Sequence, residues 1–147
     1  MKKLLLIFIV VIAAYGLLEK VPKFFSKGTF IGSEISTSDL SIEKAFKNKK
    51  SNIQLGGSGK IVKILPDDIE GSRHQKFIIE LNSGQTLLIA HNIDIAPRIS
   101  TLNVGDYINF YGEYEWNSKG GVIHWTHYDP SGRHEAGWLN HGGKVYQ

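Results

Sequence analysis

The side chains best suited to chemistry lie close together near the end of the chain. Residues 120–134 read Gly-Gly-Val-Ile-His-Trp-Thr-His-Tyr-Asp-Pro-Ser-Gly-Arg-His and include three of the six histidines. His127, Asp129 and His134 offer two imidazoles and a carboxylate, which are ligands that zinc and similar divalent ions accept. We predict a metal site if the intervening turn brings His134 back, although the spacing matches no specific metal signature. The alternative is a buried, hydrogen-bonded His127 and an exposed His134.

The segments that carry these residues have the pattern of a small β domain. From residue 53 onward apolar residues recur with a period of two, and turn residues separate five candidate strands. The strands are expected over residues 54–65, 75–81, 86–91, 104–116 and 122–128. A long first strand rich in glycine, and a connection over 92–102 with room for one helical turn, predict a small five-stranded barrel of the OB type. The tail, residues 130–147, is expected to pack on this barrel.

A short amphipathic helix is expected before the barrel. Thr37 or Ser38 can cap a helix over residues 39–49, in which Ile42, Ala45 and Phe46 share one face. Residues 19–36 show no clear period and are predicted to be a spacer. The predicted organisation is therefore residues 1–18 as signal or anchor, 19–52 as spacer and helix, and 53–147 as the barrel domain.

The first 18 residues have the pattern of an export signal. Lys2 and Lys3 precede an uncharged apolar run over residues 4–18. Fifteen helical residues rise only about 22 Å, which is short of a hydrocarbon core of roughly 30 Å. This favours a cleaved signal over a permanent anchor in the inner membrane. Both alternatives make the domain periplasmic or secreted, and the absence of cysteine agrees with an oxidising compartment.

Strand alternation predicts which side chains face the core. In the last two predicted strands the core face should carry Ile108, Phe110, Tyr114, Ile123 and Trp125. If Trp116 lies opposite Gly121, then Glu113 faces His124 and Phe110 faces His127. Glu113 and His124 are therefore candidate ligand-binding residues, with a weak surface pair as the alternative.

A second polar cluster is predicted at one end of the first hairpin. If Leu81 lies opposite Thr86, then Lys76 faces His91 and His74 lies one diagonal step away on the same face. Arg73 and Asp94 flank them, so Arg73, His74, His91 and Asp94 are further ligand-binding candidates. Chance clustering at the end of a barrel is the alternative.

The charge distribution argues against binding to nucleic acid. Residues 59–147 hold eight Lys and Arg against ten Asp and Glu, a net charge of −2 with neutral histidines. Nucleic-acid binders usually carry a basic footprint on the domain itself. The glycines at 56, 57 and 59 lack the spacing of a phosphate-binding loop and lead into a strand.

Four motifs along the barrel resemble those of a known family. They are GSRHQ at 71–75, HNIDIAPR at 91–98, GEYEWN at 112–117 and HWTHYDP at 124–130. In this order they resemble a family of small exported bacterial proteins, carried as a domain of unknown function, over residues 57–147. The resemblance implies a protein of the Gram-negative envelope, and it implies no activity or site residues.

Three classes of function remain open from the sequence. The favoured one is an exported binding module for an unknown small molecule or envelope protein. The second is a metal-dependent hydrolase that uses the His and Asp cluster with zinc or another divalent ion. The third is a structural partner in an envelope complex, with Tyr111, Tyr128 and Trp138 as exposed contact residues.

Overall fold

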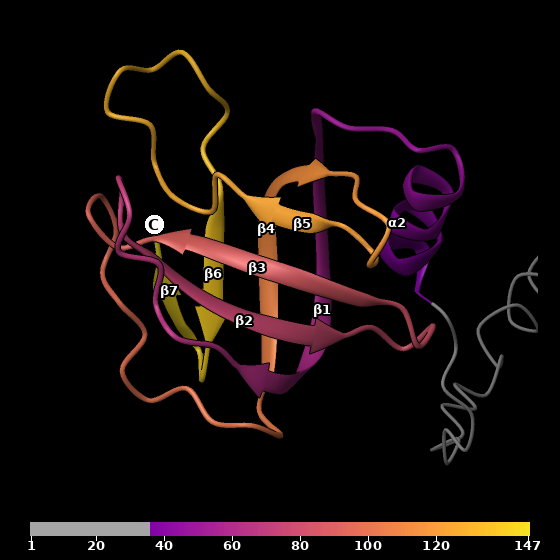
Figure 1. The fold of residues 1–147 in the computed structure, drawn as a ribbon, viewed down its shortest axis with the longest axis horizontal. Coiled ribbons are helices and arrows are strands. Elements are labelled where there is room, and N and C mark those ends of the chain that lie inside the picture. The colour runs from indigo at the N-terminus through magenta and orange to yellow at the C-terminus, as the bar shows by residue number, and fades with distance from the viewer. Residues whose placement is uncertain (1–35) are drawn as a thin grey trace, which may run out of the picture. The chain divides into compact units, whose positions relative to one another are not determined.

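The computed structural model describes residues 36–147, so the predicted export segment lies outside the described residues. Within this part, the chain forms no helix that is both long and apolar enough to cross a membrane. The described chain is mainly β, with one short helix followed by seven strands (Figure 1).

Helix α2 (Thr37–Lys47) lies beside the first strand (Figure 1). The Ser36 side chain caps it by accepting a hydrogen bond of 3.1 Å from the backbone N–H of Asp39. The helix therefore begins two residues earlier than predicted, because Ser36 and not Thr37 or Ser38 is the cap. Its apolar face is the predicted one, since Ile42 and Ala45 are buried in the core.

The sheet closes into the predicted five-stranded OB-type barrel. Its strands are β1 (Ile53–Ile64), β2 (His74–Glu80), β3 (Thr86–Asn92), β4 (Tyr107–Glu115) and β5 (Val122–His124). They pair in the order β1-β2-β3-β5-β4, and a β1–β4 pairing closes the ring. Strand β5 runs parallel to β3 and antiparallel to β4. The connection from β3 to β4 forms turns and no helix.

The C-terminal tail packs on the barrel. Strands β6 (Trp138–His141) and β7 (Lys144–Tyr146) form a hairpin that pairs with the outer edge of β4. Leu139 and Tyr146 join the hydrophobic core.

Strand β1 serves two neighbours and positions the helix. It pairs with β4 from Ile53 to Lys60 and with β2 from Lys60 onward, with a bulge after Ile61. A Cβ at Gly57 would come within 2.8 Å of the Phe110 ring and 3.3 Å of the Ile42 side chain. Glycine at this position therefore allows helix α2 and the barrel interior to pack closely.

The predicted register of the β2–β3 hairpin is wrong by one residue. Glu80, not Leu81, lies opposite Thr86. Leu81 donates to the Gln85 carbonyl at 2.9 Å, so residues 82–84 form a three-residue loop. Gly84 adopts a φ of 82° there, the left-handed position that such loops use. Because one residue of slip reverses the faces, His91 points inward opposite Gln75, and His74 points outward beside Asn92.

The β4–β5 register is confirmed, but the predicted length of the last strand is wrong. Glu113 lies opposite His124 as expected. Strand β5 then ends, because Trp125 adopts a φ of 51° and turns the chain. Thr126 is consequently fully buried while Trp125 is only partly buried, so the prediction of Trp125 as a core residue is wrong. Phe110 pairs with Leu139 of β6 rather than with His127.

The docking of helix α2 gives the first testable prediction. Ile42→Ala should lower the free energy of unfolding by about 2–4 kcal/mol, since a fully buried side chain is lost from the barrel interior. Leu40→Ala is the matched control on the same helix: Leu40 is 51% exposed, and its loss should cost under about 0.5 kcal/mol. Urea denaturation measures both, and equal losses would show that the helix does not dock through Ile42.

Candidate functional site

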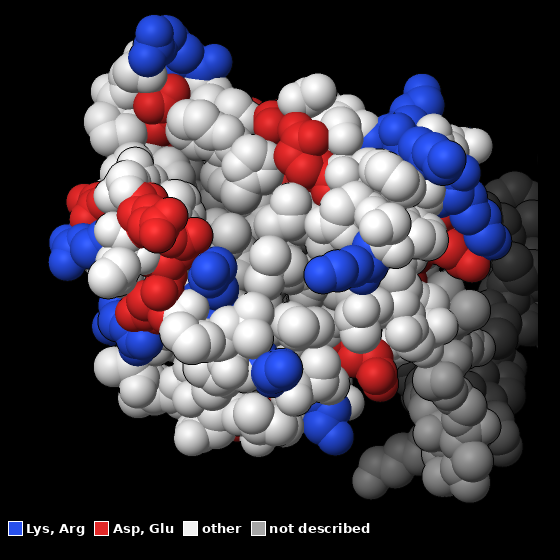
Figure 2. Space-filling view, viewed as in Figure 1, with Lys and Arg blue, Asp and Glu red and all other residues white. Residues whose placement is uncertain are grey.

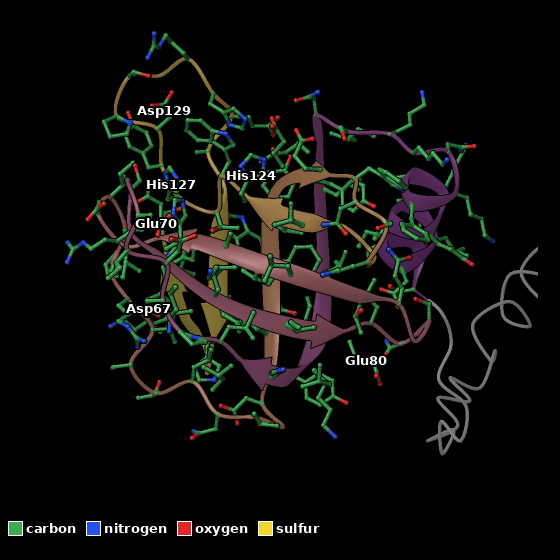
Figure 3. All side chains as sticks on the ribbon, in the orientation of Figure 1. Asp67, Glu70, Glu80, His124, His127 and Asp129 are labelled. Carbon is green, nitrogen blue, oxygen red and sulfur yellow. The ribbon has the colours of Figure 1, made fainter. Side chains whose placement is uncertain are left out.

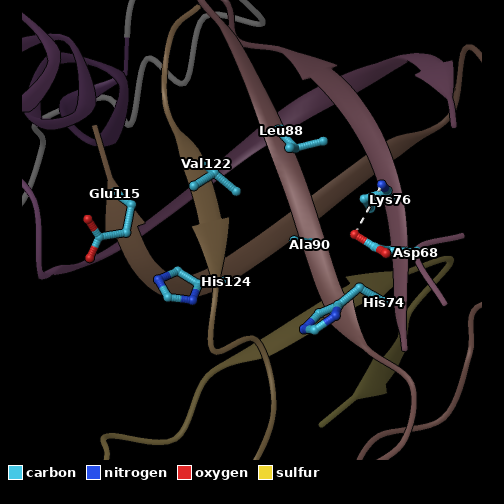
Figure 4. A pocket seen from close by; sticks show the side chains of 8 residues that line it. All are labelled: Asp68, His74, Lys76, Leu88, Ala90, Glu115, Val122 and His124. Carbon is cyan, nitrogen blue, oxygen red and sulfur yellow. Dashed lines mark hydrogen bonds and ion pairs between the residues drawn. The ribbon is translucent and has the colours of Figure 1, made fainter. Parts of the chain in front are cut away.

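A hollow of about 370 Å³ lies on the outer face of β2, β3 and β5. Leu88, Ala90 and Val122 form its apolar floor. Figure 4 shows Glu115 and His124 along one wall, and His74, Lys76 and Asp68 along the other. Its size falls in the range of small-molecule sites, which combine an apolar lining with a few convergent polar groups.

A second hollow of about 200 Å³ adjoins the first and shares His74, Ala90 and His124 with it. We refer to the two together as the groove. The second hollow is lined in addition by residues from the neighbouring loops: Ser72, Asn92, Ile95, Trp125 and His127. The outer faces of strands 2 and 3 with adjacent loops are the surface on which OB barrels bind ligands.

Polar side chains on one wall of the groove are held in place by neighbouring protein groups. His74 Nδ1 lies 2.7 Å from the backbone oxygen of Ser72 and must donate to it, so the acceptor nitrogen of a neutral ring is Nε2. Lys76 Nζ lies 3.5 Å from the carboxylate of Asp68. The Asp68 carboxylate accepts a hydrogen bond from the backbone N–H of Glu70, and this bond together with the Lys76 charge holds the pKa of Asp68 below its usual value. The wall thus presents a charged pair and an oriented imidazole.

The opposite wall carries a group of potential metal ligands. Glu113, Glu115 and His124 place one ligand atom each within 4.8 Å of one another, and no other such group of His, Cys, Asp or Glu occurs among residues 36–147. Burial lowers the pKa of His124, although the nearby charges of Glu113 and Glu115 act in the opposite direction. The lowered pKa favours the neutral imidazole.

The predicted metal ligands His127, Asp129 and His134 are not brought together as such a group. Figure 3 shows Asp129 in the loop beyond His127. The carboxylate of Asp129 accepts hydrogen bonds from the hydroxyl and N–H of Ser131 and from the N–H groups of Arg133 and His134. These bonds, that from the Ser131 hydroxyl first, hold the pKa of Asp129 well below its usual value. Asp129 therefore shapes the loop over residues 125–137.

His134 anchors the end of this loop against β4. Its ring stacks on Trp125 with centroids 4.1 Å apart, and its Nε2 lies 2.7 Å from Glu113 Oε2. The Nδ1 atom faces the Glu135 carbonyl at 2.8 Å. Burial alone would lower the pKa of His134, but these two hydrogen bonds and the nearby carboxylate charges raise it. Both nitrogens face acceptors, which favours the imidazolium form.

His127 is buried and contributes to the second hollow. Its Nδ1 donates to the Tyr128 carbonyl at 2.8 Å, and its ring lies 5.3 Å from that of Trp125. His127 is thus the buried, hydrogen-bonded residue of the alternative given in the sequence analysis. His134, which the same alternative expected to be exposed, is partly buried.

His91 lies inside the barrel, away from the groove. Its Nε2 faces the Pro97 carbonyl at 3.2 Å and its Nδ1 the Thr126 hydroxyl at 2.8 Å. The carbonyl must accept, so Nε2 donates and Nδ1 accepts from Thr126. Burial lowers the pKa of His91 to about 4. Together with Gln75, which bonds both backbone groups of Ile99, His91 holds the β3–β4 connection over the barrel end.

Arg73 and Asp94 form an exposed ion pair that joins two loops. Asp94 accepts from the backbone N–H of Arg73 at 2.7 Å and from its Nε at 2.6 Å. These hydrogen bonds lower the pKa of Asp94. Neither side chain lines the groove. Arg73 thus joins two loops, whereas His74, the next residue, lines the groove.

The proposed contact residues of a structural partner differ in exposure. Tyr128 is 58% exposed. Tyr111 and Trp138 stack on each other at 6.3 Å and are partly buried, and the Tyr111 hydroxyl donates to Glu135.

Sequence reasoning missed three charged residues of the groove: Glu115, Lys76 and Asp68. Glu115 was recognisable in part, because it lies two residues after Glu113 and so shares its face of the strand. Asp68 lies in the β1–β2 loop and reaches the groove through an isolated bridge to His74, which no local pattern indicates.

The chain belongs to the family DUF3465, proteins of unknown function, whose model matches residues 26–147. The match begins well before residue 57 and includes helix α2 and part of the predicted spacer. No curated protein matches the chain.

The buried His91 predicts a pH dependence of stability. Above pH about 6.5 the His91 ring is neutral in both the folded and the unfolded protein. Between pH about 6.5 and 4 only the unfolded protein takes up the proton. The free energy of unfolding therefore decreases by up to about 3 kcal/mol as the pH is lowered through this interval. His91→Gln should be less stable at pH 7, yet lose less stability over this interval. His74→Gln, on the outer face, is the control and should keep the wild-type slope in urea denaturation. An unchanged slope in His91→Gln would contradict the assignment.

Proposed function

We propose that this member of the DUF3465 family is a binding module that holds a small polar ligand without net negative charge in the groove. The observation that carries the proposal is the groove itself. It combines an apolar floor with polar groups on both walls, on the face that OB barrels use for ligands.

The chemistry of the walls supports a ligand rich in hydroxyl or amino groups. Asp68 and Glu115 accept hydrogen bonds and Lys76 donates them. The neutral ring of His74 accepts through Nε2, while His124 donates or accepts according to its tautomer. The floor of Leu88, Ala90 and Val122 suits the apolar side of such a molecule. Carboxylates outnumber the single lysine, so an anionic ligand would be repelled.

The charge of the domain supports the same choice. Residues 36–147 contain twelve Lys and Arg and twelve Asp and Glu. On the face shown in Figure 2, basic side chains gather over helix α2 and the residues that follow it, whereas elsewhere they are dispersed among acidic and uncharged ones. A single-stranded nucleic acid needs a basic path along its backbone, so this surface argues against such a ligand.

Nuclear magnetic resonance of the labelled full chain tests the groove directly. Four probes are added in the presence of a chelator: a neutral disaccharide, a diamine, a dicarboxylate and an oligothymidylate. We expect the disaccharide or the diamine to shift backbone signals of groove residues, and the dicarboxylate and the oligothymidylate to leave them unchanged.

The matched variants are Ala90→Phe and Val145→Phe. Phe at position 90 fills the floor shared by both hollows and should abolish the shifts. Val145 is an exposed residue of β7, so Phe there should leave the shifts intact. The proposal fails if no probe moves the groove signals, or if the anionic probes bind there.

We also propose that the domain works outside the cytoplasm, exported through residues 1–18. The support is the basic start and the uncharged apolar run of the sequence. Expression in a Gram-negative host followed by fractionation should recover the domain from the periplasm or the inner membrane, and mass spectrometry should distinguish a cleaved signal from a retained anchor. Replacing Leu6 and Ile9 with Asp should retain the protein in the cytoplasm. A wild-type chain found in the cytoplasm with Met1 intact would contradict export.

A further inference from the structure

The pairing of β4 with β5 assembles two carboxylates and an imidazole. Glu113 lies directly opposite His124, and Glu115 follows two residues later on the same outer face of β4. The ligand atoms of the three residues lie within 4.8 Å of one another, and each side chain is partly buried. Two like charges are therefore held together in a place of reduced solvent access.

His124 presents a nitrogen with no hydrogen-bond partner to this pair. Its Nε2 is shielded from solvent and unsatisfied within the described structure. The atom lies 3.4 Å from Glu113 Oε1. Buried polar atoms in native structures nearly always have a partner, so an unsatisfied nitrogen beside carboxylates indicates a missing one.

The separation of these two atoms suits a shared metal ion. Zinc binds nitrogen and oxygen ligands at about 2.0–2.2 Å, so two ligand atoms in a tetrahedral site lie about 3.4 Å apart. The observed distance between His124 Nε2 and Glu113 Oε1 has this value. Glu115 places one oxygen within 4.8 Å of a ligand atom on each of the other two residues, which makes it the candidate third ligand.

The second oxygen of Glu113 is already oriented by another residue. His134 holds Glu113 Oε2 at 2.7 Å and is itself fixed by stacking on Trp125. Carboxylates that bind metals are typically held in this way by outer hydrogen bonds. The loop over residues 125–137 thus supports Glu113 in a single orientation, with Oε1 toward His124.

We propose that Glu113, Glu115 and His124 bind a divalent transition-metal ion of the zinc type on the wall of the groove, with His134 as a positioning residue for Glu113. One imidazole and two carboxylates are a ligand set that zinc and similar borderline ions accept. Three protein ligands leave a coordination position for water or another small molecule. Since Glu115 and His124 line the groove, that position is accessible from it.

This site differs from the one predicted from the sequence, which used His127, Asp129 and His134. In the structure the carboxylate oxygens of Asp129 accept hydrogen bonds from the loop backbone and from Ser131, and His134 is hydrogen-bonded to Glu113. The proposal also stands apart from the organic ligand of the groove. Metal binding is measured with no organic probe present, while the groove test contains a chelator, so each can fail alone.

Zinc titration of the full chain, purified without an affinity tag and stripped with a chelator, tests the site. A competing chromophoric chelator reports the affinity, and we expect one ion per chain. His124→Ala and Glu115→Gln should each weaken zinc binding by about tenfold or more. His134→Ala should weaken it less, since this residue orients Glu113 and does not touch the ion.

Two control variants remove the same kinds of side chain, an imidazole and a carboxylate, at positions outside the proposed metal site. His74→Ala removes an imidazole from the opposite wall of the groove, and Glu135→Gln removes a carboxylate of the same loop that carries His134. Both should bind zinc as the wild type does. Metal-free melting curves of all variants show whether each one folds.

A spectroscopic measurement on the wild type keeps the test independent of variant folding. Nitrogen chemical shifts of the imidazole rings should show that zinc moves Nε2 of His124 and leaves His74 unchanged. The proposal is overturned if zinc does not bind, or if His74→Ala weakens binding as much as His124→Ala. It is equally overturned if Asp129→Asn and His127→Ala abolish binding while His124→Ala retains it.

Discussion

The barrel depends on a strand of only three residues. Strand β5 pairs with β3 along one edge and with β4 along the other, so Val122, Ile123 and His124 join the two halves of the sheet. Because side chains alternate, Ile123 enters the core and its neighbours face outward. The same closure that seals the core therefore places Val122 beside Leu88, and His124 beside Glu113. Any shift of this strand would disturb the groove and the proposed metal ligands together.

Two polar side chains inside the barrel are fully paired within the protein, whereas one on its outer face is not. Gln75 and His91 are buried, and each finds protein partners for its polar atoms. These bonds secure the β3–β4 connection and leave nothing for a ligand. On the outer face, by contrast, His124 Nε2 has no partner among the described residues. The hydrogen bonds of Gln75 and His91 thus hold the fold, while His124 Nε2 is available for binding.

The loop over residues 125–137 gains rigidity without regular structure. Asp129 gathers the N–H groups that a strand would have paired, and His134 joins the loop to Glu113. The stacking of His134 on Trp125 brings the two ends of the loop together. The sequence pattern suggested a metal site in this loop, whereas in the structure the loop supports the Glu113 carboxylate of β4 through His134.

Part of this arrangement was predictable from the sequence. The barrel, the buried face of helix α2 and the Glu113–His124 register all follow from local alternation, capping and turn residues. The turn before β5 is one such case, because Asn117 accepts hydrogen bonds from Lys119 and Gly121 and so sets the register. Local patterns suffice here because each involves residues that are near one another in the chain.

The tertiary structure decided which of the other side chains meet. The left-handed Gly84 moved the β2–β3 register by one residue and sent His91 inside, while the left-handed Trp125 ended β5 and buried Thr126. A single backbone torsion reverses the face of every following residue, and alternation alone cannot reveal it. The groove itself arises from the parallel pairing of β3 with β5, segments more than thirty residues apart. Contacts of that kind depend on closure of the whole barrel, because no local pattern of residues specifies them.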